Sequence, residues 1–202
     1  MAITDGLATL AQVKTNLDLT DSVDDTMLEL CIESASRQIE QFTERIFTQV
    51  SATRIYTPRD SYVVETDDIY SITHLKTSTA ADGVFDETWA ASDRQTEPLN
   101  GIAGGIASPI TSIRAVGDYL FPISGGEATV QIAGTFGWAA IPTAITQACI
   151  LQSSRYYKRA DSPMGVAGFD AMGVVRLSRI DPDIATLIEP FCKIRMVLCS
   201  KG

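Results

Sequence analysis

The first quarter of the chain carries apolar residues at helical spacing. In residues 7–18 they follow steps of three, three and four positions, which predicts an amphipathic helix of about three turns. The positions are Leu7, Leu10, Val13 and Leu17. A longer apolar stripe with the same spacing follows, to about residue 48, and acidic residues gather at its start, where a helix dipole favours them. The pattern therefore predicts two amino-terminal helices.

Helical spacing returns in the last third of the chain. Pro142 suits the first turn of a helix whose apolar face runs to about Ala160. A last apolar stripe begins with Asp181 as a capping residue and Pro182 at the first helical position. Pro190 lies inside this stripe and predicts a kink or break, because it removes a backbone donor and clashes with the preceding turn. The pattern thus predicts two carboxy-terminal helices.

Between the helices, short β-branched and aromatic runs alternate with Gly, Pro, Asp and Ser, which indicates antiparallel strands and turns. Residues 97–109 and 161–175 are rich in glycine and are predicted to be loops. The predicted fold is α+β, with the amino- and carboxy-terminal helix pairs forming a helical bundle and a small antiparallel β unit inserted between them. The predicted parts are residues 1–48, 49–140 and 141–202, as one globular domain with an insertion.

Composition narrows the function. Sixteen Lys and Arg residues against 25 Asp and Glu residues give a formal charge of −9, which disfavours a surface that neutralises nucleic-acid phosphates. No apolar run approaches the roughly 18 residues that a membrane helix needs, so no membrane contact is expected. The four cysteines form no Cys-x-x-Cys pair and are predicted to be buried, reduced thiols of a protein made in the cytoplasm.

Residues that could support catalysis or metal binding are sparse. The single histidine, His74, accompanies no motif of nucleophilic catalysis and is interpreted as a solvated or hydrogen-bonded strand residue. The nearest candidates for a metal site are two adjacent acidic pairs, Asp24 with Asp25 and Asp67 with Asp68, and such pairs are usually helix caps or solvated faces. We expect no catalytic residue, cofactor or metal, and hence no enzyme.

Three segments together resemble the head-tail connector (adaptor) family of long-tailed bacteriophages. They are LATLAQVKTNL with DDTMLELCIESASRQIEQFTERIF, then GTFGWAAIPTAITQACILQSSRYYKRADSPMGVAG, and DPDIATLIEPF. The second is the most specific, since a Gly-aromatic-Gly-Trp strand end, a helix-starting Pro, an Arg-Tyr-Tyr-Lys-Arg helix end and an Asp-Ser-Pro-Met-Gly turn occur in that order. The β middle matches this family only loosely.

The resemblance implies a structural virion protein at the head-tail interface. Members of the family form homo-oligomeric rings, commonly dodecamers, beneath the portal protein, bind a head-completion or tail protein below, and surround the channel for double-stranded DNA. It implies partner contacts in the second glycine-rich segment and the last helix, and the basic run at the end of the third helix is, from its residues alone, a candidate for contact with an acidic partner surface or passing DNA. The contact candidates are Arg155, Tyr156, Lys158, Arg159, Met164, Phe169, Phe191 and Ile194.

Both the role of the charged run and the class of protein have alternative interpretations. The charged run from Arg155 to Arg159 is also explained by complementation of the negative helix end and by solvation, without any partner or DNA. Another virion ring component, a head-completion stopper or a tail terminator, would share the acidity and ring formation, but it should be predominantly β. A small-ligand binding domain would need convergent polar groups in a pocket.

Overall fold

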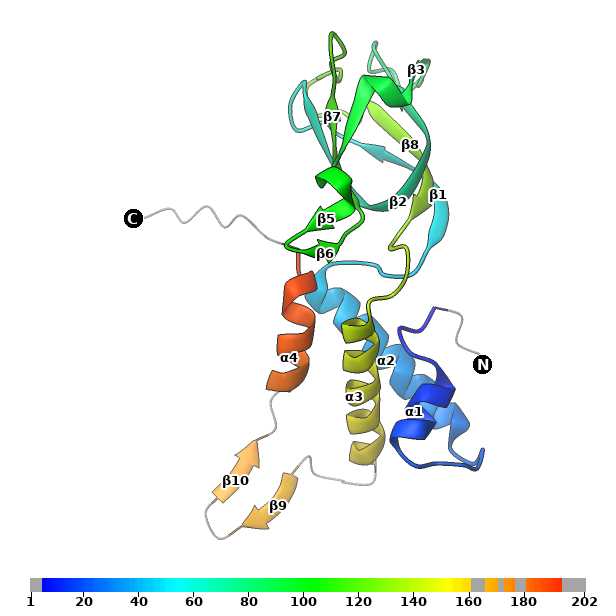
Figure 1. The fold of residues 1–202 in the computed structure, drawn as a ribbon, viewed down its shortest axis with the longest axis vertical. Helices are drawn as coiled ribbons and strands as arrows, with labels where there is room; N and C mark the ends of the chain where they lie inside the picture. Colours follow the sequence, from blue (N-terminus) through cyan, green and yellow to red (C-terminus); the bar gives the residue numbers. More distant parts are fainter. Residues whose placement is uncertain (1–4, 161–165, 171–172, 177–180, 194–202) are drawn as a thin grey trace. The chain divides into compact units, whose positions relative to one another are not determined.

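The chain folds into two compact units. The structure is a computed structural model that describes residues 5–160, 166–170, 173–176 and 181–193. One unit comprises Met1–Arg45 with Ile141–Gly202, and the other comprises Ile46–Ala140. We call them the helical unit and the β unit. Figure 1 shows the elements of each.

The helical unit is centred on α3 (Thr143–Ala160), which contacts α1 (Leu10–Asn16), α2 (Asp25–Thr43) and α4 (Pro182–Ile188). These helices form because each buries one apolar stripe. The stripe of α2 is Leu28, Cys31, Ile32, Ala35 and Ile39, and α3 buries Ile145, Ala148, Cys149 and Ile150.

Polar side chains join α2 to its neighbours in the helical unit. The Ser36 hydroxyl donates to the Ile32 carbonyl at 2.7 Å and accepts the Leu7 N–H at 3.0 Å, so a fully buried hydroxyl is satisfied. Gln38 Oε1 accepts hydrogen bonds from Gln152 Nε2, at 2.7 Å, and from the Tyr156 hydroxyl.

The ends of the helices follow the capping residues. Thr9 and Gln12 form a reciprocal capping box at the start of α1. Asp181 caps α4 through the Asp183 N–H at 3.1 Å. The α-helix ends at Ile188 and continues only as the 3-10 turn η3 (Glu189–Phe191), which confirms the break predicted at Pro190.

In the β unit a six-stranded antiparallel sheet takes the order β1-β8-β2-β7-β4, with β3 also paired to β2. The strands are β1 (Val50–Tyr56), β2 (Val63–Thr77), β3 (Glu87–Trp89), β4 (Arg94–Glu97), β7 (Ile110–Ala115) and β8 (Val130–Phe136). The long β2 pairs with β7 through its first half and with β8 through its second half.

Smaller elements complete the described chain. The β unit also holds the 3-10 turns η1 (Ala91–Asp93) and η2 (Leu99–Gly101) and the two-residue strands β5 (Ile102–Ala103) and β6 (Ile106–Ala107). The helical unit also holds β9 (Val166–Asp170) and β10 (Gly173–Arg176), which pair antiparallel.

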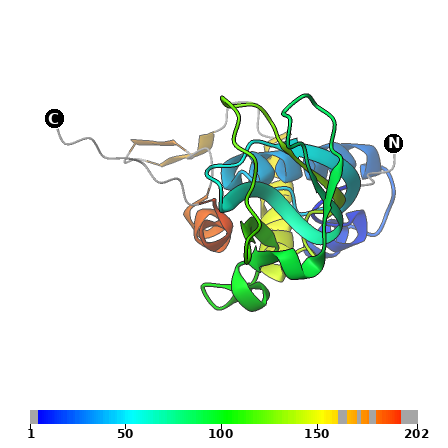
Figure 2. The ribbon, with the colours of Figure 1, turned by 90° about the horizontal axis from the view of Figure 1, so that it is seen from above.

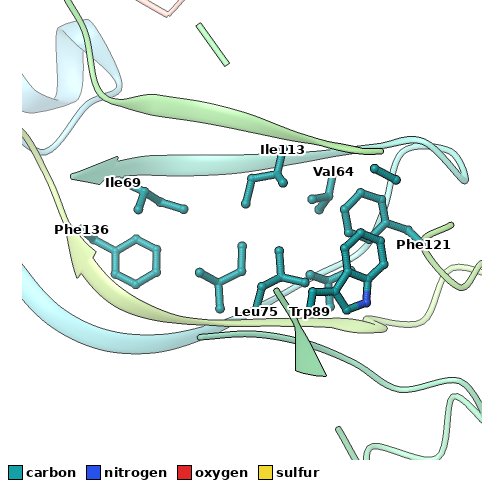
Figure 3. Packing of buried hydrophobic residues seen from close by; sticks show 10 residues of the cluster. Val64, Ile69, Leu75, Trp89, Ile113, Phe121 and Phe136 are labelled. Carbon is teal, nitrogen blue, oxygen red and sulfur yellow. The ribbon is translucent and has the colours of Figure 1, made fainter. Parts of the chain in front are cut away.

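The β unit has a hydrophobic core of its own, enclosed by the sheet (Figure 3). At one end the rings of Trp89 and Phe121 stack with centroids 4.6 Å apart. The buried members are Val64, Ile69, Leu75, Trp89, Ile113, Ala115, Phe121, Val130, Ile132 and Phe136. A separate core of this size shows why the sheet is a major part of the fold.

The prediction of a helical bundle with a small inserted β unit was therefore wrong. The chain is α+β, but its larger ordered element is the six-stranded sheet, while α1 and α4 span only 7 residues each. Strand β2 continues through the polar residues Thr66–Asp68 and spans 15 residues in all. The domain boundaries at residues 48 and 140 stay predictions.

Asp67 forms a charged cluster with two residues of β1. Its Oδ2 lies 2.7 Å from Arg54 Nη1 and accepts the Tyr56 hydroxyl at 3.1 Å. Arg54 also places its guanidinium 4.2 Å from the centre of the Phe136 ring. Burial, and then the charge of Asp67, raise the pKa of Tyr56 to about 12.

This shift predicts a loss of stability in alkali. The unfolded chain releases the Tyr56 proton near its ordinary pKa of about 10, but the folded chain keeps it. The stabilisation is complete below pH 10 and is lost as the pH rises to about 12. Because Tyr56 is partly exposed, we expect about 1 kcal/mol. Denaturant unfolding between pH 9 and 12 should show a smaller alkaline loss for Tyr56→Phe than for the wild type. The exposed Tyr70 provides the control Tyr70→Phe, which should follow the wild type.

Candidate assembly surfaces

Two of the predicted contact residues, Arg155 and Tyr156, bond within the helical unit. Arg155 Nη1 lies 3.3 Å from Gln152 Oε1 and 3.7 Å from Asp181 Oδ2, so it ties the end of α3 to the start of α4. The Tyr156 hydroxyl donates to Gln38 on α2. Both side chains are partly exposed. Their described contacts are those of helix packing.

Lys158 and Arg159 lie exposed in the last turn of α3. Positive charge there complements the partial negative charge of the helix end. The neighbouring Tyr157 points back to the amino-terminal part and donates to Asp24 Oδ2 at 2.6 Å. Lys158 and Arg159 are thus the basic pair that this surface offers to solvent, and a role in partner contact stays a prediction.

Of the other four contact candidates, two lie outside the described residues and two lie within them. Met164 and Ile194 lie outside the described residues. Phe169 belongs to β9 and its backbone pairs with Val174 of β10. Phe191 is 6% exposed and packs in the core of the helical unit. The contact roles of all four remain predictions.

The residues considered for chemistry are dispersed. Among the described residues, no group of three or more His, Cys, Asp and Glu side chains could hold a metal ion. His74 is exposed on β2. Cys31 and Cys149 are buried free thiols, Cys192 is half-buried, and burial raises the pKa of all three. Within the part of the chain that the structure describes, no helix has the length and apolar character needed to cross a membrane.

An open groove lies over β2, β4 and β7, and two ion pairs line it. Arg59 Nη1 is 3.1 Å from Glu65 Oε1, and Arg114 Nε is 3.1 Å from Glu97 Oε1. These side chains are 31–67% exposed, so the pairs are screened by solvent and contribute little to stability.

Two groups of exposed aliphatic side chains were not predicted from the sequence. One lies at the start of α2, and the other lies around β5 and β6. The members are Val23, Met27 and Leu30 in the first group, and Leu99, Ile102 and Ile106 in the second. A signal for the second was present in the sequence, because no charged residue occurs from Pro98 to Ile113.

A family model matches part of the chain. Residues 7–80 match the phage gp6-like head-tail connector protein family. The matched residues contain α1, α2, β1 and β2, whereas the segment that carried the most specific resemblance in the sequence lies outside them. No curated protein matches.

Solved structures share the fold over nearly the whole chain. The neck of an empty gene transfer agent particle, computed with C6 symmetry, is 20% identical with a TM-score of 0.59, covering 98% of this chain and 95% of the other. The neck of the native particle, computed with C12 symmetry, is 20% identical with a TM-score of 0.58, covering 98% of this chain and 94% of the other. A native virion of the gene transfer agent is 22% identical with a TM-score of 0.54, covering 98% of this chain and 95% of the other. At these identities the likeness is one of fold. The family match confirms the resemblance noted in the sequence: residues 7–80 of this chain are similar to the gp6-like head-tail connector family.

Proposed function

We propose that this chain is a structural virion protein, a head-tail connector subunit that forms a ring under the portal and joins capsid to tail around the DNA channel. The observation that carries the proposal is the match of residues 7–80 to the head-tail connector family. This is a family of structural components, and the chain therefore works by binding its neighbours and not as an enzyme.

The likeness to neck structures supports a ring of identical subunits. Two of those structures are necks computed with C6 and C12 symmetry, and the shared fold covers 98% of this chain. A dodecamer made by the same cyclic repeat would place each subunit against two neighbours through two different surfaces. The charge of −9 per subunit would weaken adhesion to DNA passing through the channel. The portal protein above and a head-completion or tail protein below are the partners that this position requires.

The family match also separates the connector from the other ring components. The six-stranded sheet makes the chain richer in β structure than the sequence predicted, so helix content is weaker evidence against a stopper or tail terminator. The match to the connector family includes both amino-terminal helices and does not depend on helix content.

The proposal predicts a defect in joining heads to tails. Deletion of the gene should leave DNA-filled heads and free tails, and supply of the wild-type chain in trans should restore tailed particles. Electron microscopy of the restored particles should show a ring of this fold between portal and tail. Tailed particles formed at the normal yield without the chain would refute the proposal, as would its density outside the neck.

A further inference from the structure

One exposed aliphatic group of the β unit lies on a projection that we call the finger, residues 98–109, between β4 and β7. Leu99 and Ile102 are 59% and 57% exposed, and Ile106 is 36% exposed. In both views of the ribbon, β5 and β6 stand clear of the six-stranded sheet (Figures 1 and 2). No charged residue occurs in these 12 positions, although 20% of the whole chain is charged.

Local bonds give the finger a defined shape. At its base, the ion pair of Glu97 and Arg114 joins the two strands that it connects. The Gly101 N–H donates to the Pro98 carbonyl at 3.1 Å, and the Gly101 carbonyl accepts the Ser108 N–H at 2.9 Å. At the tip, Gly104 and Gly105 have φ values of +58° and +80°, which suit the two-residue turn of a tight hairpin. The aliphatic side chains are thus presented on a folded element.

The second aliphatic group forms what we call the helix face, composed of Val23, Met27 and Leu30. These residues are 84%, 45% and 61% exposed and recur at steps of four and three. Val23 lies in the turn before α2, and Met27 and Leu30 lie on α2 outside its buried stripe. Glu29 and Glu33 lie beside them on the same helix. The helix face is therefore an apolar surface with an acidic border.

We propose that the finger of one subunit binds the helix face of the next subunit in the ring. This inference rests on the proposed function, because a closed ring needs two different surfaces that fit each other. The finger brings no charge of its own, so the acidic border of the helix face would not repel it as it would repel an acidic surface. Six aliphatic side chains make a small interface, so the contact should be weak between free subunits and should form when the neck holds them together.

Cysteine cross-linking in assembled particles tests the proposal. Particles complemented with the Leu30→Cys/Ile102→Cys chain should give, under oxidising conditions, a ladder of cross-linked species on a non-reducing gel. The single variants should give none. The control Leu30→Cys/His74→Cys pairs the helix face with an exposed residue of β2 and should also give no ladder. Electron microscopy of the same particles shows whether the ring is present.

The outcomes separate the two proposals. A ladder specific to the first pair supports finger-to-helix contact. A visible ring without a ladder overturns this contact and leaves the proposed function standing, while a neck that lacks the chain refutes both.

A second measurement uses substitutions at the surface. Leu30→Asp and Ile102→Asp should each lower incorporation into the neck at least tenfold relative to Ile123→Asp. Ile123 is 58% exposed and lies outside both surfaces, so it is a matched control. Unchanged thermal unfolding of the purified chains shows that the fold is kept. Equal incorporation of all three variants would contradict the proposal.

Discussion

The substitution Gly134→Ala is expected to lower the free energy of unfolding of the β unit by about 3 kcal/mol. Gly134 lies in β8, paired with Ala52 of β1 on one side and Ile72 of β2 on the other. A Cβ atom there would stand 2.1 Å from the Ser71 carbonyl oxygen. That oxygen belongs to the backbone of a paired strand and cannot turn aside as a side chain would, so β2 and β8 must separate locally.

Both tryptophans of the chain, Trp89 and Trp138, lie in the β unit, so their fluorescence reports its unfolding in denaturant. Gly104→Ala is the matched control. An added Cβ at Gly104 meets nothing within 4 Å, and only the left-handed backbone at φ +58° opposes it, at about 1 kcal/mol. Equal losses for the two variants would show that close packing of β8 on β2 is not the cause.

The positions of the helices were predicted because each is encoded locally, although α1 spans 7 residues where a helix over residues 7–18 was expected. Three local signals act over a few residues each: the apolar spacing, the proline at the start of α4 and the break at Pro190. All three are seen in the structure. The sheet is encoded differently, since a strand is stabilised by residues distant in the sequence. Asp67 and Asp68 were considered as a candidate metal site or a solvated face, but their partners are Arg54, 13 residues away, and Trp138, 70 residues away. No local pattern shows such partners.

The candidate surfaces likewise combine features that are visible in the sequence with features that only the fold shows. The run from Arg155 to Arg159 was visible in the sequence, but only the structure shows that Tyr156 is bonded to Gln38 on another helix. The finger was interpreted as a glycine-rich loop, because a hairpin with two-residue strands has no periodicity to detect. Its lack of charge was legible in the sequence, whereas the exposure of its aliphatic side chains required the fold.

The neighbours Asp67 and Asp68 are expected to differ sharply when each is replaced by alanine. Asp68→Ala should lower the free energy of unfolding of the β unit by about 2–3 kcal/mol. Asp68 is 4% exposed, and its Oδ2 accepts the Trp138 indole N–H at 2.9 Å. The alanine variant would remove the carboxylate that accepts this buried N–H. Asp67→Ala should cost less than about 1 kcal/mol, because the Asp67 side chain is 49% exposed and its ion pair with Arg54 is screened by water.

These two carboxylates have different surroundings although they are adjacent in sequence, since Asp68 is 4% exposed and the Asp67 side chain is 49% exposed. The indole of Trp138 packs 5.4 Å, centre to centre, from the ring of Phe47, and Asp68 holds the indole from the other end through its N–H. Loss of this bond should therefore change the Trp138 fluorescence of the folded chain as well as its denaturation midpoint, whereas Asp67→Ala should leave the folded-state spectrum as it is. If Asp67→Ala proved the more destabilising, the cluster of Arg54, Tyr56 and Asp67 would stabilise the sheet more than the hydrogen bond between Asp68 and Trp138 does.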